Sequence, residues 1–170
     1  MSRLALLVGS FSTMVTFTAA GQLASPRDTT RATIGSATIL VDYGRPSKRG
    51  RKIIGALVPF GSVWRTGANE ATTLVTNQPL KLGTLVVPAG KHTLWTLPGA
   101  TGWKLIINNQ TGQWGTDYDP KEDLGRVDMQ VSRLPAEVEK FTIKITPGPG
   151  GGVLALEWES TRASIPFTAK

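Results

Sequence analysis

The chain of 170 residues contains no cysteine. This absence excludes disulfide bonds, thiolate metal sites, a cysteine nucleophile and lipidation of an N-terminal cysteine. The chain also has a single histidine and only two tyrosines. Beyond the first twenty residues, no apolar run is long enough to cross a bilayer, which takes about 20 mostly apolar residues.

Residues 1–20 have the composition of an export signal. Arg3 gives a positively charged start, residues 4–17 are mostly apolar, and residues 18–20 have small side chains suited to cleavage. We expect cleavage after Ala20 and a periplasmic or extracellular location, which fits a cysteine-free chain in a bacterial envelope. The alternative is that the uncleaved signal acts as a membrane anchor, the one membrane contact that the sequence allows.

The net charge of +7 favours anionic partners through long-range attraction. An anionic small molecule, an anionic glycan or an envelope protein would suit this charge, and a basic surface without a ligand is the alternative. Export and the lack of a recognition helix or stacking motif argue against nucleic acid. No cofactor-binding motif is present, so we expect no cofactor.

Alternation of apolar and polar residues predicts β-strands along most of the chain. In residues 140–145, Phe141, Ile143 and Ile145 alternate with lysine and threonine, as in a strand with one buried face and one wet face. Other segments share this pattern or a composition rich in β-branched and aromatic residues. They are residues 39–43, 72–76, 84–87, 91–97, 103–107, 127–133, 154–159 and 163–168.

Turn residues separate these strands at short intervals, as in the proline- and glycine-rich residues 147–152. Many short, evenly spaced strands predict a single-domain antiparallel β-sandwich of jelly-roll or Greek-key type with little helix. One short helical turn is expected at most, at residues 53–58 or 121–124. We expect the domain to span residues 32–170 and to follow a loose segment at residues 21–31.

Residues 45–72 carry more charged and aromatic side chains than a solvated loop or a core strand needs. We expect a ligand pocket here, in which Trp64 supplies a flat face and Arg65 a fixed cationic fork. Asn69 and Glu70 would supply hydrogen-bonding partners. An internal polar network is the alternative.

In that network, Arg65 would pair with Glu70 or Asp42, because a buried arginine needs a charged partner. Asn69 would then cap a turn rather than contact a ligand. The two arrangements differ in whether Arg65 is neutralised inside the protein, which the sequence does not decide.

A basic loop precedes this segment and extends the predicted pocket. Arg45, Arg49 and Arg51 could bind phosphate, sulfate or carboxylate groups. Their spacing lacks the order of a phosphate-binding loop, in which glycines precede a lysine and a serine or threonine. A solvated basic loop is the alternative.

The tryptophans and the histidine divide into core and surface candidates. Trp103 and Trp158 are in phase with aliphatic residues and are expected in the core. Trp114 lies in a glycine-flanked loop and is the better candidate for an exposed ligand-binding face. His92 shares a strand face with apolar residues, which predicts a half-buried structural role rather than catalysis.

Acidic residues crowd into residues 117–123. Asp117, Asp119 and Asp123 are weak candidates for a metal site, because calcium prefers clustered oxygen ligands. Pro120 and Lys121 interrupt the run, which does not match the twelve-residue helix–loop–helix calcium pattern. An exposed acidic loop is the alternative.

Six segments form a motif set that extends over nearly the whole chain after the signal. They read SPR at residues 25–27, VDYGRP at 41–46, KRGRKIIGALVPFGSVWRTGANEAT at 48–72, PAGKHTLWTLP at 88–98, QWGTDYDPKED at 113–123 and LEWESTRASIPF at 156–167. This set resembles the DUF2911 family of exported bacterial proteins of unknown function. The resemblance implies export, one β-rich domain and no established activity.

Together these patterns favour an exported β-sandwich that binds a ligand or partner at the cell envelope, and they do not favour an enzyme. The alternative is an envelope hydrolase for a glycan or ester, with Glu70 or the acidic residues 117–123 as acid and base. A structural or assembly component is the second alternative.

Overall fold

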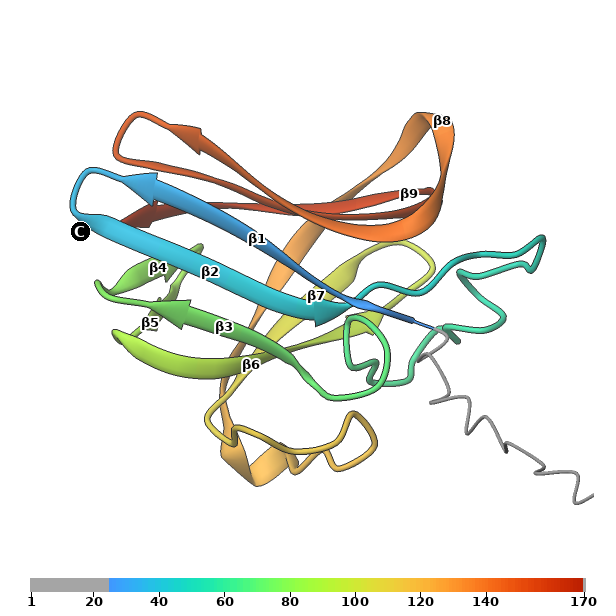
Figure 1. The fold of residues 1–170 in the computed structure, drawn as a ribbon, viewed down its shortest axis with the longest axis horizontal. Helices are drawn as coiled ribbons and strands as arrows, with labels where there is room; N and C mark the ends of the chain where they lie inside the picture. Colours follow the sequence, from blue (N-terminus) through green and yellow to red (C-terminus); the bar gives the residue numbers. More distant parts are fainter. Residues whose placement is uncertain (1–24, 170) are drawn as a thin grey trace, which may run out of the picture.

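Nine antiparallel strands build the part of the chain that the computed structural model describes, residues 25–169 (Figure 1). The strands are β1 (Arg27–Ile34), β2 (Ala37–Gly44), β3 (Thr72–Thr76), β4 (Leu80–Leu82), β5 (Leu85–Val87), β6 (Gly90–Pro98), β7 (Trp103–Asn108), β8 (Asp123–Gly148) and β9 (Gly151–Ala169). Within these residues the one helical element is the short 3-10 helix η1 (Pro120–Glu122), close to the expected turn at 121–124. The expected all-β sandwich is confirmed.

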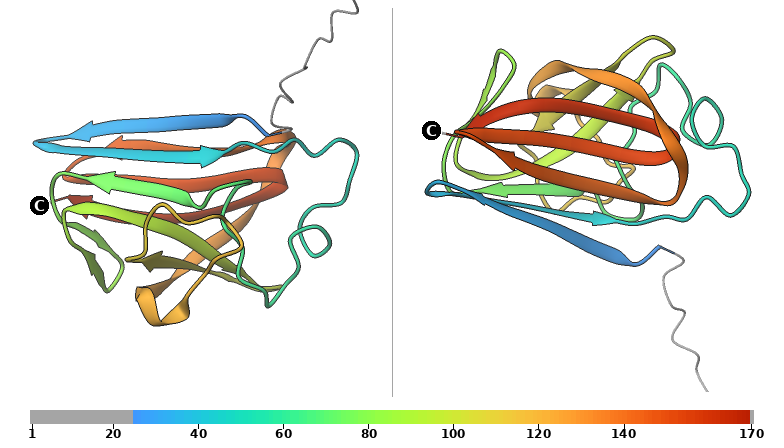
Figure 2. Two further views of the ribbon diagram at one scale, coloured as in Figure 1. Left: turned by 60° about the horizontal axis from the view of Figure 1, so that its bottom comes forward. Right: turned by 90° about the horizontal axis from the view of Figure 1, so that it is seen from above.

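The strands follow the order β1-β2-β3-β6-β7-β8-β9-β4-β5 and fold into two layers (Figure 2). Strand β8 is 26 residues long and belongs to both layers, because its first part pairs with β7 and its later part with β9. The change of partner falls between Met129 and Gln130, and register shifts between Arg133 and Thr142 interrupt the pairing with β9. The β4–β5 hairpin follows β3 in sequence but pairs with β9.

The main core fills the space between the layers. Val41 and Tyr43 of β2 and Phe141 and Ile143 of β8 are at most 2% exposed. The rings of Tyr43 and Phe141 meet edge to face at 5.6 Å. The backbone N–H of Ile143 donates to the Tyr43 hydroxyl at 3.1 Å, which supplies the polar end of this buried ring with a partner.

A second, smaller cluster lies on the other face of β6 and β7. Trp95 and Ile106 are buried there with Ala71, and Val63 and Tyr118 pack against them from loops. Strand β6 is therefore buried on both faces, and the simple alternation expected for a half-exposed strand does not hold for it. Loops from two distant parts of the chain serve as its cover.

The N-terminal boundary differs from the expectation. Strand β1 begins at Arg27, so the later part of the segment expected to be loose, residues 21–31, is paired with β2. The predicted export signal at residues 1–20 lies outside the described residues. Among residues 25–169, no helix is long and apolar enough to span a membrane.

Candidate functional site

A loop leaves the β3–β6 ladder between Trp64 and Thr72. Thr72 pairs with Leu94 of β6, whereas Trp64 pairs with Thr96, only two residues further along the same strand. Trp64 and Thr96 exchange two backbone hydrogen bonds of 2.8 and 2.9 Å. The intervening residues 65–71, here called the 65–71 loop, are therefore excluded from the sheet and held at both ends.

The backbone of this loop adopts conformations that non-glycine residues rarely take. Thr66 has a φ of 54° and Asn69 a φ of 63°. Left-handed backbone costs of order 1 kcal/mol or more per residue, and it is most unusual for a β-branched side chain such as threonine. Buried hydrogen bonds hold it in place: Thr72 Oγ1 donates to the Thr66 carbonyl at 2.7 Å, and the Thr66 hydroxyl contacts Thr96 Oγ1 at 3.2 Å.

Two glycines let the loop lie against its neighbours. A Cβ added at Gly44, at the end of β2, would clash with the carbonyl oxygen of Ala68. A Cβ added at Gly115 would clash with Arg65 Cδ and with the carbonyl oxygen of Asn69. That carbonyl accepts a hydrogen bond from the Gly115 N–H at 3.0 Å. Contact at these two points fixes where the Arg65 side chain starts.

A cavity of about 320 Å³ opens beside the loop, and we call it the cationic cavity. It lies at the end of the sandwich that carries residues 45–71, here called the loop end (Figure 1). Its lining comes from four parts of the chain: Ser25, Pro46, Arg51, Leu57, Val58, Trp64, Arg65, Gly67, Ala68, Asn69 and Trp158. Trp64 stacks on Trp158 with ring centroids 5.9 Å apart. The predicted residues Arg51, Trp64, Arg65 and Asn69 thus share one cavity.

The two arginines of the cavity have no acidic partner. Arg51 donates from Nε and Nη2 to the backbone carbonyls of Lys48 and Ser47, at 3.0 and 2.8 Å. Arg65 has no hydrogen bond or ion pair with any of residues 25–169, and its Nε is buried without an acceptor. No aspartate or glutamate is among the lining residues. The cavity therefore carries uncompensated positive charge.

The alternative network, in which Arg65 pairs with Glu70 or Asp42, is wrong, because Arg27 pairs with both carboxylates. Arg27 Nε donates to Asp42 Oδ1 at 2.6 Å, and its Nη1 lies 3.0 Å from Glu70 Oε2. Arg27 reaches them from β1, the strand that pairs with β2. The sequence argument missed this competitor because it assigned Arg27 to a loose segment.

The other predicted site residues lie outside the cavity lining. Arg45 donates to the Phe141 carbonyl at 3.2 Å and to Thr142 Oγ1 at 3.1 Å, and it pairs with Asp28. These contacts attach the chain after β2 to β8. Arg49 is exposed, with its backbone N–H on Glu139 Oε1 at 2.8 Å.

Glu70 and Trp114 also stay out of the cavity. They pair with each other through the backbone, next to the Arg27 ion pairs. Trp114 is 46% exposed, as expected for the tryptophan of the glycine-flanked loop. Its predicted ligand contact stays a prediction.

The apolar part of the cavity was not predicted from the sequence. Trp158 was expected only in the core; it is 3% exposed and also forms part of the cavity wall. Leu57 and Val58 belong to a tight turn in which the Val58 N–H donates to the Ile53 carbonyl at 2.9 Å. Leu57 is nevertheless 50% exposed, a signal that appears only once the fold is known.

The acidic candidates for a metal site have separate partners. Asp119 accepts a hydrogen bond from the Lys121 N–H at 2.9 Å and caps η1. Asp123 accepts from the Tyr118 hydroxyl at 2.7 Å and pairs with Arg126. Within the described part of the chain, no group of three or more histidine or acidic side chains could hold a metal ion.

Burial, aided by the hydrogen bond to Asp123, raises the pKa of Tyr118 to about 12. Its ring packs on Trp95 at 4.9 Å, in the second hydrophobic cluster. The Tyr118–Asp123–Arg126 contacts thus fix the loop that covers the outer face of β6. They do not create a reactive group near neutral pH.

His92 is buried in β6, with 6% of its surface exposed. Its Nε2 lies 3.1 Å from the Pro88 carbonyl, and its Nδ1 is buried without a partner among the described residues. The histidine is more deeply buried than the half-buried side chain that was expected, and its position is structural.

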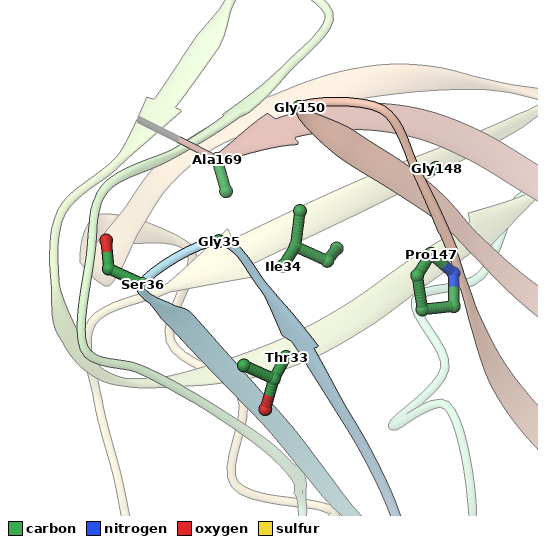
Figure 3. Close-up of a pocket in the computed structure, with 8 residues that line it drawn as sticks. All are labelled: Thr33, Ile34, Gly35, Ser36, Pro147, Gly148, Gly150 and Ala169. Carbon is green, nitrogen blue, oxygen red and sulfur yellow. The ribbon is translucent and has the colours of Figure 1, made fainter.

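A second cavity, of about 430 Å³, lies at the opposite end of the sandwich, here called the hairpin end. Figure 3 shows its lining, which comes from the β1–β2 turn, the β8–β9 turn and the end of β9. The members are Thr33, Ile34, Gly35, Ser36, Pro147, Gly148, Gly150 and Ala169. No charged or aromatic side chain is among them, so this cavity offers little chemistry for selective binding.

Comparison with known proteins gives a family and no activity. No curated protein and no solved structure matches the chain. A family model described as "Protein of unknown function (DUF2911)" matches residues 25–167, which include strands β1 to β8, all but the last two residues of β9 and the whole lining of the cationic cavity. The chain belongs to the DUF2911 family.

Proposed function

We propose that the protein is an exported binding module of the cell envelope that holds an anion in the cationic cavity. The observation that supports this most directly is that Arg65 has no acidic partner within residues 25–169. Its guanidinium has no partner within residues 25–169, and its Nε is withdrawn from water. A buried donor without an acceptor costs about 1–3 kcal/mol, and more when it is charged.

A carboxylate, phosphate or sulfate group in the cavity would compensate the guanidinium charge, which none of residues 25–169 neutralises. Charge-assisted hydrogen bonds from arginine to such oxygens are short and about twice as strong as neutral ones. The second guanidinium, Arg51, is held in position by backbone carbonyls that leave its charge uncompensated. The volume of about 320 Å³ lies at the lower end of the range of about 300–1,000 Å³ typical of small-molecule sites.

Carboxylate-dependent hydrolysis has less support than binding. Glu70 is ion-paired with Arg27, and Asp123 is ion-paired with Arg126. Both carboxylates are therefore engaged by arginines, and neither is part of the lining of the cationic cavity. An assembly role is likewise a secondary hypothesis, because no described surface identifies a protein partner.

Titration calorimetry and thermal shift of the protein purified after expression of the full chain test this proposal. The probes are acetate, phosphate and sulfate at low ionic strength, where screening is weak. We expect at least one anion to raise Tm by mass action. Arg65→Gln should weaken its binding at least tenfold, whereas Arg31→Gln, which removes an exposed charge of β1, should leave it within about twofold. Absence of any anion effect, or an equal effect in Arg65→Gln, contradicts the proposal.

A further inference from the structure

We infer that the ligand of the cationic cavity is an amphiphile with one anionic head group and an apolar tail. This inference rests on the proposed anion binding and adds the chemical class of the ligand. The head group would be a carboxylate, phosphate or sulfate, since all three present oxygens that a guanidinium can bind in pairs.

The polar groups of the cavity point to a single head group. Asn69 donates from Nδ2 to the Ser25 carbonyl at 2.9 Å, and the Trp64 indole N–H donates to the Gly67 carbonyl at 3.2 Å. Arg51 already uses two of its donors on backbone carbonyls. Arg51 keeps its remaining N–H groups and Arg65 makes no hydrogen bond within residues 25–169, so most of the free donors belong to guanidinium groups, which suit one anionic group.

The same contacts argue against a sugar or a nucleotide. A sugar needs several directional donors and acceptors, and most of those in the lining are already engaged. A nucleotide base needs an open aromatic face. The faces of Trp64 and Trp158 are stacked on each other, and Phe141 contacts Trp64 at 5.0 Å from another direction.

Five side chains give part of the lining an apolar character that a hydrocarbon tail can contact. Pro46, Leu57, Val58, Trp64 and Trp158 provide this surface. Leu57 is 50% exposed although the turn that carries it is closed by hydrogen bonds from Gly55 and Val58. A leucine held in a rigid turn beside an apolar wall, and covered by none of residues 25–169, is surface that a tail would remove from water.

A series of straight-chain carboxylates from acetate to octanoate, kept below micelle formation, tests the inference by calorimetry. Each methylene that enters the cavity should lower Kd about fourfold, the factor that corresponds to about 0.8 kcal/mol per buried CH₂. The gain should level off once the cavity is full. Octanol, which lacks the charge, should bind at least tenfold more weakly than octanoate. Octyl phosphate and octyl sulfate then identify the preferred head group.

Leu57→Ser separates the tail from the head group. It should reduce the gain per methylene and leave the shortest bound anion within about twofold. Val86→Ser is the matched control, because Val86 is 57% exposed on β5 and lies outside the cavity lining. It should change neither quantity.

The outcomes distinguish this inference from the proposed function. If short anions bind through Arg65 but Kd is the same for every chain length, the amphiphile is excluded and anion binding stands. An unchanged gain per methylene in Leu57→Ser also overturns the inference, since the tail would then lie elsewhere. If no anion of any length binds, both proposals fail.

Discussion

The two ends of the sandwich both hold a cavity, yet they are built in different ways. At the hairpin end, two-residue turns join paired strands, and the glycines with positive φ, Gly35 and Gly150, have no neighbouring atom where a Cβ would stand. At the loop end, a threonine and an asparagine take the left-handed backbone, glycines are closely packed, and an arginine is left unpaired. The hairpin end is built from the turns that reverse the chain between paired strands.

The loop end thus contains several features that lower stability without serving the fold. Strained backbone and unsatisfied charge persist when the surrounding structure enforces them, and they gather where a protein binds or reacts. Their absence from the lining of the larger cavity at the hairpin end indicates that cavity size alone is a poor guide to function. The following substitutions compare the two ends directly.

The largest difference in the free energy of unfolding should come from replacing one glycine at each end with alanine. Gly44→Ala places a methyl group against the Ala68 carbonyl, and overpacking against backbone should cost about 3 kcal/mol. Gly35→Ala meets open space, so its cost is that of the left-handed backbone, about 1 kcal/mol. Urea unfolding measures both free energies. If the two variants lose the same free energy of unfolding, the backbone near Ala68 can shift to accommodate the new methyl group.

At the loop end, replacing a paired arginine should lower the free energy of unfolding, whereas replacing an unpaired arginine should not. Arg27→Met breaks the contacts to Asp42 and Glu70 and should lower the free energy of unfolding by about 1–2 kcal/mol. Arg65→Met removes a charge without a partner and should leave stability unchanged or raise it by up to about 1 kcal/mol. Thermal unfolding of both variants gives the comparison. A marked loss in Arg65→Met would indicate an internal structural role for this arginine.

The smallest effect concerns alkaline pH and the loop that covers the outer face of β6. Burial raises the pKa of Tyr118 to about 12, above the value of about 10 in an unfolded chain. The folded state therefore keeps this proton longer, and the resulting stability is complete below pH about 10 and is lost as pH rises through about 12. Burial also raises the pKa of Tyr43, so both tyrosines contribute to the loss of stability at alkaline pH.

Tyr118→Phe should accordingly reduce the decline of stability between pH about 10 and about 12 without abolishing it. Urea midpoints at several pH values test this, and tyrosinate absorbance follows the two tyrosines of the chain directly. An equally steep decline in the variant would place the titrating group elsewhere.

Local patterns were enough to predict much of the fold, since alternation in segments such as residues 140–145 depends on burial of one face. The cover over Trp95 was not predictable in this way, because it comes from loops distant in sequence. Arg51, Trp64, Arg65 and Asn69 were grouped because they lie close together in sequence, and all four line one cavity. The partner of Arg65 was not predictable, because Arg27 reaches the carboxylates from a strand whose pairing depends on long-range register.

The two attachment points of the 65–71 loop lie only two residues apart on β6, a separation of about 7 Å along a strand. A segment whose ends are fixed this close together can change in length at little cost, because loop-closure entropy grows only slowly with the number of residues. Replacement of the loop would leave the pairing of every strand in place. The sandwich therefore provides a frame in which one stretch of chain, and with it the charge and shape of the cavity, can change while its two attachment points on β6 are kept.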